Sequence, residues 1–138
     1  MHAGIPADYP LREGPWLFDL GLARVEHRLE GRRLRYRVLD GERAGLSEAV
    51  PFEVRRIASA LFWVSWQEGD GTTVVHLEDF GRNAFESCVT LPQLALLRLR
   101  GTMRRQPPGT CAATADLPGS GGATPGGAPA RTDRGDIR

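Results

Sequence analysis

The feature that most limits what this chain can fold into is an alternation of polar and apolar residues, broken by turn residues about every ten positions. Successive side chains of a β-strand point to opposite faces, so this alternation is typical of a sheet with one buried face. The pattern repeats over residues 18–29, 33–39, 50–57, 61–68, 73–80, 83–90 and 94–103. Residues 10–105 contain no long helical stripe. We therefore expect an all-β fold, an antiparallel meander of about seven or eight strands in a sandwich or barrel.

Composition divides the chain into two parts. Residues 106–138 contain 7 of the 17 glycines, 5 of the 10 prolines and no aromatic residue. Such a segment buries too little apolar surface to offset its chain entropy, so we expect a disordered Pro/Gly-rich tail over 106–138. The folded barrel is expected within residues 1–105 and ordered from about residue 10.

Charge and cysteine content exclude several classes of protein. The chain has 18 cationic and 17 acidic side chains, a net charge of +1, so neither a nucleic acid nor a membrane surface is an expected partner. All the cations are arginine, which excludes Schiff-base chemistry on a lysine. Cys88 and Cys111 are too few for a disulfide framework. With no signal-peptide pattern and no long apolar run, we expect a cytoplasmic protein with free thiols.

The hairpin over residues 61–80 allows the most detailed prediction of strand register. Asp70-Gly71 suits a two-residue type I′ turn, which would place Ser65 opposite His76. A second turn at Gly81-Arg82 continues the register into the next strand. The side chains that then share one face are those of Leu61, Trp63, Ser65, Gln67, Val74, His76, Glu78, Phe80, Phe85, Ser87 and Val89. A shift of one residue would exchange this face with the other.

We predict that this face points inward and forms the functional site. Large aromatic residues around a few converging polar groups are the usual lining of a small-molecule cavity, and a barrel of about eight strands can enclose one such ligand. The expected ligand-binding residues are Trp63, Ser65, Gln67, His76, Glu78, Phe80 and Phe85. The other face is also apolar and would then need cover from a terminal segment or from a second subunit of a homodimer. The alternative is that the first face is outward and its polar groups are only solvated.

Part of this region resembles a known family. The runs Trp63-Val-Ser-Trp-Gln-Glu68, Thr73-Val-Val-His76 and Glu78-Asp-Phe80, together with the strand at 97–102, resemble the family of molybdenum cofactor biosynthesis protein F (MoaF). The resemblance covers roughly residues 17–103. It implies a lipocalin-like, calycin-type antiparallel barrel with a central pocket, akin to the phenolic acid decarboxylases. It implies little about a reaction, because a fold does not fix a function.

His76 and Glu78 are the candidate catalytic residues. They lie two positions apart on one strand, so their side chains leave the same face roughly 6–7 Å apart. A buried pair of this kind can transfer protons. The function expected from the sequence is a lipocalin-type protein that binds a small apolar or aromatic metabolite. The alternatives are a metal-independent lyase or isomerase that uses this pair, and a protein–protein module that uses the apolar second face.

The sequence favours neither metal binding nor acyl transfer. His76 and Glu78 offer two ligands, and His27 would have to approach from another strand to complete the three protein ligands of a catalytic zinc. We therefore expect no metal and no cofactor. Ser65 and His76 have the chemistry of a nucleophile and its base, but the chain has no Gly-x-Ser-x-Gly elbow to expose the serine.

Overall fold

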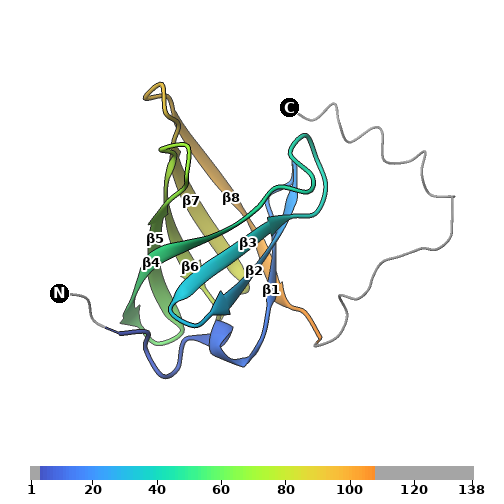
Figure 1. Cartoon of the computed structure of the whole chain (residues 1–138). Helices are drawn as coiled ribbons and strands as arrows, with labels where there is room; N and C mark the ends of the chain where they lie inside the picture. The colour runs from blue at the N-terminus through green and yellow to red at the C-terminus, as the bar shows by residue number, and fades with distance from the viewer. Residues whose placement is uncertain (1–3, 108–138) are drawn as a thin grey trace, which may run out of the picture.

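The structure is a computed structural model that describes residues 4–107. Its eight strands form one closed antiparallel barrel, in which each strand pairs with its sequence neighbours and the last pairs with the first (Figure 1). The strands are β1 (Trp16–Asp19), β2 (Arg24–Glu30), β3 (Arg33–Val38), β4 (Ser47–Ala58), β5 (Leu61–Gln67), β6 (Thr73–Asp79), β7 (Ala84–Thr90) and β8 (Leu96–Arg105). The predicted all-β meander is confirmed, and its closure makes it a barrel. Over residues 4–107, no helix is long and apolar enough to cross a membrane.

The last strand ends at Arg105, and the described residues continue only to Pro107. The predicted tail over residues 106–138 therefore lies almost wholly outside the described residues, and its character stays a prediction. The described structure begins at Gly4, ahead of the position expected from the sequence, and Tyr9 is already buried in the core.

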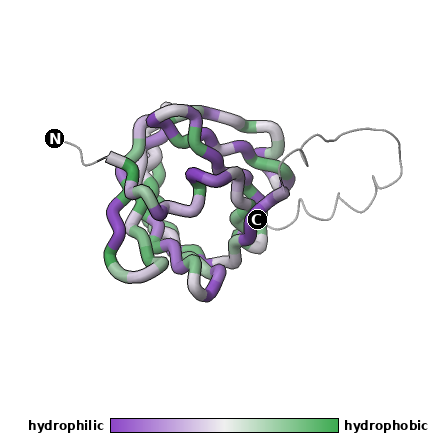
Figure 2. The backbone as a smooth tube through the Cα atoms, turned by 90° about the horizontal axis from the view of Figure 1, so that it is seen from below, coloured by the Kyte–Doolittle hydropathy of each residue, from purple (hydrophilic) through white to green (hydrophobic). Residues whose placement is uncertain are grey.

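The segment before β1 closes one end of the barrel. It contains a short 3-10 helix, η1 (Pro10–Glu13), whose Leu11 is buried. Tyr9 meets Phe62 and Phe80 edge-on, with ring centroids 5.1 and 5.9 Å apart. Figure 2 looks into the barrel from this end, where the N-terminal segment crosses the opening. The barrel interior is therefore closed at the end that carries η1.

The turn between β5 and β6 differs from the predicted two-residue turn. The N–H of Gly71 donates to the carbonyl oxygen of Glu68 at 2.9 Å, and the N–H of Glu68 donates to the carbonyl oxygen of Thr72 at 2.7 Å. Gly71 has a φ of +96°, but Asp70 does not take the positive φ that a type I′ turn requires. The loop is therefore three residues long, a type I turn followed by a left-handed glycine.

The additional loop residue shifts β5 by one position against β6. Val64, not Ser65, lies opposite His76. The predicted register for this pair of strands is wrong, and the two faces of β5 are exchanged. The buried side chains of β5 are those of Phe62, Val64 and Trp66.

The register between β6 and β7 is confirmed. Glu78 lies opposite Phe85, and His76 lies opposite Ser87, as the sequence predicts. All four side chains are buried. The predicted inward face is thus correct for β6 and β7, although it is reversed on β5.

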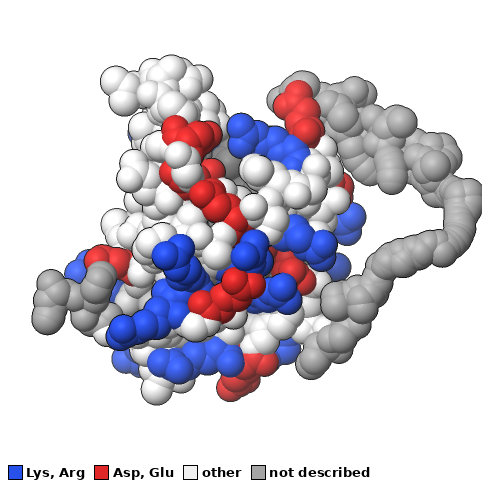
Figure 3. All heavy atoms as spheres, viewed as in Figure 1, with Lys and Arg blue, Asp and Glu red and all other residues white. Residues whose placement is uncertain are grey.

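The outer wall carries charges of both signs. Arg35 and Glu30 form an ion pair at 2.7 Å, and Arg24 and Asp40 form another at 2.8 Å. Figure 3 shows basic and acidic side chains next to one another on the face that it displays. These exposed pairs each add little to stability, because water and salt screen them.

Candidate functional site

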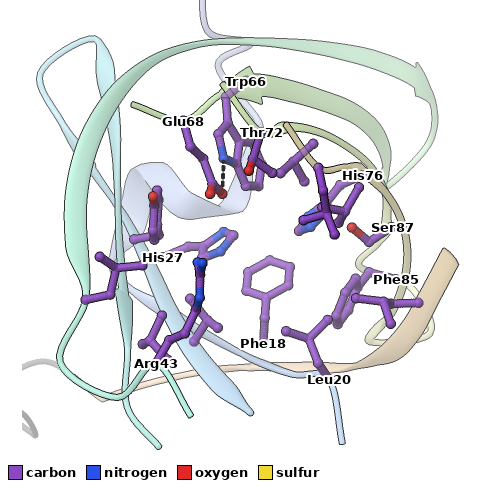
Figure 4. Close-up of a pocket in the computed structure, with 18 residues that line it drawn as sticks. Phe18, Leu20, His27, Arg43, Trp66, Glu68, Thr72, His76, Phe85 and Ser87 are labelled. Carbon is purple, nitrogen blue, oxygen red and sulfur yellow. Dashed lines mark hydrogen bonds between the residues drawn. The ribbon is translucent and has the colours of Figure 1, made fainter. Parts of the chain in front are cut away.

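A cavity of about 170 Å³ occupies the barrel at the end away from η1. It opens between the loops that follow β1, β3, β5 and β7, because Leu20, Leu46, Thr72 and Leu91 are among its lining residues. Figure 4 shows lining side chains pointing into this space from the strands around it. The labelled lining residues are Phe18, Leu20, His27, Arg43, Trp66, Glu68, Thr72, His76, Phe85 and Ser87.

Aromatic and imidazole rings form the floor of the cavity. The Phe18 ring stacks on His27 with centroids 4.3 Å apart and lies 5.5 Å from the ring of His76. Trp66 and Phe85 contact His76 at 4.9 and 5.1 Å. The two imidazole rings are nearly parallel, at 10° and 5.7 Å between centroids. The packing of these rings holds both histidines in the floor of the cavity.

A buried polar network lies beneath this floor. Nδ1 of His76 lies 2.9 Å from Oε2 of Glu78, and the hydroxyl of Tyr9 donates to Oε1 of Glu78 at 2.8 Å. The Glu78 side chain is fully buried, so its polar atoms need these partners. A carboxylate beside Nδ1 favours the His76 tautomer with its proton on that atom. Nε2 is then the nitrogen of His76 that can accept a hydrogen bond from a molecule in the cavity.

His27 lacks the partner that His76 has. Its Nδ1 is shut off from solvent and makes no hydrogen bond within the described residues. Burial, with a contribution from His76, lowers the pKa of His27 well below its usual range, because both disfavour a positive charge on His27. His27 is therefore a neutral imidazole with an unsatisfied ring nitrogen.

The barrel brings His27, His76 and Glu78 together. One potential ligand atom of each lies within 4.8 Å of those of the other two, and all three side chains are buried. His27 comes from β2, which faces β6 across the barrel because the two strands are separated by three others in either direction. The sequence gives no signal for this contact, because it depends on how the sheet closes and not on the spacing of residues along the chain.

Three of the predicted ligand-binding residues lie outside the cavity. Trp63 is 43% exposed, Gln67 is also exposed and Ser65 is half-buried on the outer wall. They point away from the interior because the three-residue loop after β5 reverses the faces of that strand. This placement corrects the predicted set of lining residues.

The other four predicted residues are inside the barrel but at two levels. His76 and Phe85 line the cavity. Glu78 lies behind His76, and Phe80 packs against Trp16 near the closed end with ring centroids 4.8 Å apart. Of the predicted set, therefore, only His76 and Phe85 can touch a molecule in the cavity without rearrangement.

Several lining residues were missed at the sequence level. Trp66 belongs to the face of β5 that the sequence predicts to point outward, and Phe18 and His27 lie on strands for which the sequence predicts no ligand-binding residue. The sequence predicts that Ser87 lies on the inward face but does not mark it as a ligand-binding residue. Alternation on 18–29 could have marked Phe18 as inward, but not which residues it would meet.

A carboxyl group lies at the mouth of the cavity. The indole Nε1 of Trp66 donates to Oε2 of Glu68 at 3.2 Å, as the dashed line in Figure 4 shows. Partial burial raises the pKa of Glu68 above its usual range. Glu68 and Arg43 both line the cavity, so its entrance carries one acidic and one basic side chain.

The fold is that of a lipocalin-like barrel protein: a closed eight-stranded meander with an interior cavity and with one end closed by the N-terminal segment. The profile of the MoaF-like family matches residues 17–104, and the chain belongs to this family. Among solved structures, a Burkholderia vietnamiensis protein provisionally described as a beta-lactamase is similar, with 28% identity and a TM-score of 0.64. That match covers 67% of this chain and 91% of the other. A comparison with curated protein sequences found no match.

Proposed function

We propose that this protein binds a small apolar or aromatic molecule in the barrel cavity, with His76 and Ser87 contacting a polar group on it. The observation that carries this proposal is the position of both side chains in the lining of an otherwise largely apolar cavity. Apolar walls with a few converging polar groups are the usual composition of small-molecule sites.

The size of the cavity limits the ligand. At about 170 Å³ it is comparable to the roughly 150 Å³ cavity that is known to bind benzene, and it is smaller than the roughly 300–1,000 Å³ pockets that hold drug-sized ligands. A single aromatic ring with a small polar substituent fits these limits. Phenol is therefore a suitable probe, and toluene is its apolar counterpart.

The experiment compares two serines that differ in direction. Ser87→Ala removes a hydroxyl from the cavity, whereas Ser65→Ala removes one from the outer wall. We expect Ser87→Ala to weaken phenol binding by about 2–10-fold, since a hydrogen bond contributes roughly 0.5–1.5 kcal/mol, and to leave toluene binding unchanged. Ser65→Ala should change neither. Equal effects of the two variants, or no binding of either probe to the parent protein, would contradict the proposal.

The second candidate is a lyase or isomerase that works without a metal in the same cavity. The contact of 2.9 Å between His76 Nδ1 and Glu78 favours it, because a buried carboxylate that orients an imidazole leaves Nε2 as a general base toward the cavity. This candidate can be tested once a ligand has been identified. In D₂O, the protein should exchange a carbon-bound proton of that ligand for deuterium, and Glu78→Gln should slow this exchange. Binding without exchange favours the first proposal.

Serine beta-lactamase chemistry is not supported for this chain. The serine enzymes of this kind use a Ser-x-x-Lys motif, and the sequence has no lysine. The cavity is also smaller than the pockets that hold drug-sized molecules. The similarity to the Burkholderia vietnamiensis protein therefore supports the fold and not that activity.

Exposed residues of the outer wall support two further proposals, one on cellular location and one on oligomeric state. The cytoplasm stays the proposed location, supported by the free thiol of the exposed Cys88.

A homodimer through β5 and β6 also stays a proposal. Trp63 and Leu77 lie opposite each other there, 43% and 37% exposed, and two adjacent apolar side chains of this size favour burial against a partner.

A further inference from the structure

We propose that His27, His76 and Glu78 form a binding site for one divalent transition-metal ion of the zinc class, in the floor of the cavity. Imidazole nitrogens and a carboxylate oxygen are the ligands that such ions take, and a set of two histidines and one glutamate is a known donor set for zinc. The three candidate atoms lie within 4.8 Å of one another.

His27 gives the second, independent observation. It is 4% exposed, and its Nδ1 has no hydrogen-bond partner within residues 4–107. A buried polar nitrogen without a partner is unfavourable and uncommon in folded proteins, so it requires an explanation. A metal ion between His27 and the pair formed by His76 and Glu78 would give this imidazole a partner that no described protein group supplies.

The present distances require only a modest closure. Ligand atoms about 2.0–2.1 Å from a tetrahedral zinc lie roughly 3.3–3.5 Å apart, so an upper limit of 4.8 Å calls for a movement of about 1–1.5 Å. Rotation of an imidazole about its side-chain bonds can supply it. For His76 to bind the ion through Nδ1, the proton that this nitrogen directs at Glu78 would have to move to Nε2, because the ligating nitrogen of a neutral imidazole carries no proton.

The surroundings suit a metal site. The hydroxyl of Tyr9 donates to Oε1 of Glu78, and such outer hydrogen bonds commonly orient a ligating carboxylate. Phe18, Phe85 and Trp66 pack around His76 and limit the access of water. Glu78 would be the one anionic ligand, and the cation would offset the cost of burying its charge.

Such an ion would be open toward the cavity. His27 and His76 line the cavity, whereas Glu78 lies below them, so three protein ligands would approach from the walls and from beneath. Catalytic zinc sites keep a fourth position for water or substrate. The site would therefore favour cavity ligands with an oxygen or nitrogen donor. Metal binding itself does not depend on the proposed organic ligand and is tested without one.

The test uses the untagged full chain, freed of metal with a chelator. We expect titration calorimetry to show one Zn²⁺ bound per chain, Co²⁺ to give visible absorption bands of a low-coordinate nitrogen and oxygen site, and Mg²⁺ not to bind. Zn²⁺ should also raise the midpoint of thermal unfolding, because an ion that binds only the folded state stabilises it. No binding of Zn²⁺ or Co²⁺ would overturn the proposal.

Variants assign the ligands. Glu78→Gln and His27→Gln should weaken Zn²⁺ binding by more than 100-fold, whereas Tyr9→Phe, which removes an outer hydrogen bond, should weaken it by roughly 10–100-fold. If His27→Gln does not fold, His27→Phe takes its place, because phenylalanine keeps a ring against Phe18. Controls are His2→Ala, Cys88→Ser and Cys111→Ser, which remove the third histidine and the two thiols of the chain. Unchanged binding in the His27 variants, or loss of binding in any control, would overturn the proposal.

Discussion

The hydroxyl of Tyr9 donates to Oε1 of Glu78 at 2.8 Å, across 69 positions of the sequence. Tyr9 belongs to the segment that closes the η1 end of the barrel, and Glu78 contacts His76 in the floor of the cavity. The hydrogen bond therefore ties the closure of the barrel to the position of the candidate catalytic pair. Burial and the nearby Glu78 raise the pKa of Tyr9 well above its usual range, so the phenol stays protonated and remains a donor.

Tyr9→Phe should destabilise the fold by about 1–3 kcal/mol. The substitution keeps the ring contacts with Phe62 and Phe80 but leaves Glu78 without one of its two partners, and an unsatisfied buried acceptor carries a penalty of that size. Urea unfolding measures the difference. Tyr36→Phe is the matched control, because its hydroxyl donates to Glu48 at 2.7 Å in a partly buried position, and it should cost less. The reverse order of the two costs would show that the link to Glu78 is not structurally important.

The stability of the metal-free protein should fall in mild acid because of His27. Its pKa is lowered in the folded state, so below about pH 6.5 the unfolded chain binds a proton that the folded chain does not. The contribution of His27 is fully present above the unfolded pKa and is lost as the pH falls, by up to about 1.4 kcal/mol per pH unit. His76 and Glu78 lie nearby and are unchanged in His27→Phe, so the informative quantity is the difference from this variant. Unfolding midpoints between pH 7.5 and 5 should fall less steeply in the variant, and parallel pH profiles would contradict the neutral buried state of His27.

Gly71→Ala should destabilise the hairpin between β5 and β6 by about 1 kcal/mol or more. A Cβ at Gly71 would meet no atom within 4 Å, so the cost comes from the positive φ of +96° alone. Gly81→Ala is the control in the next hairpin, because Gly81 does not have a positive φ and its Cβ would make only ordinary contacts. Thermal unfolding of both variants gives the comparison. A neutral Gly71→Ala would remove the support for the left-handed residue in this turn.

Gly101→Ala should disrupt the closure of the barrel. A Cβ at Gly101 would collide with the backbone carbonyl oxygen of Asp19, where β8 pairs with β1. Backbone cannot yield as a flexible side chain can, and overpacking of this kind costs about 1–3 kcal/mol. The free energy of unfolding should therefore fall further than it does in Gly81→Ala. Similar values for the two variants would argue against the tight seam between β1 and β8.

The sequence was sufficient for the strand pattern and for the register of β6 with β7, because one short turn connects two strands with clear alternation. It was insufficient for β5. Gly69-Asp70-Gly71 suits either a two-residue or a three-residue loop, and residues 61–68 carry aromatic side chains on both faces, so hydrophobicity could not choose between the two registers. The hydrogen bonds from Gly71 and Glu68 settle the matter in favour of the longer loop.

The candidate site, too, could be predicted only in part, but the reason is not the one that applies to β5. His76 and Glu78 lie on one strand, so their proximity follows from local geometry alone. Their contacts with His27 and Tyr9 join β6 to strand β2 and to the N-terminal segment, far apart in sequence. Such contacts arise from closure of the barrel and carry no signal in residue spacing.

The most direct test of a ligand site inside the barrel uses two tryptophans three residues apart on β5. Trp66 lines the cavity and is 8% exposed, whereas Trp63 points outward and is 43% exposed. In ¹H–¹⁵N spectra, each indole N–H gives a separate signal that can be assigned by substitution with phenylalanine. Titration with phenol should shift the Trp66 signal in a saturable way and leave the Trp63 signal unchanged. A saturable shift of Trp63 with none at Trp66 would contradict both the observed register of β5 and the assignment of the ligand site to the barrel interior.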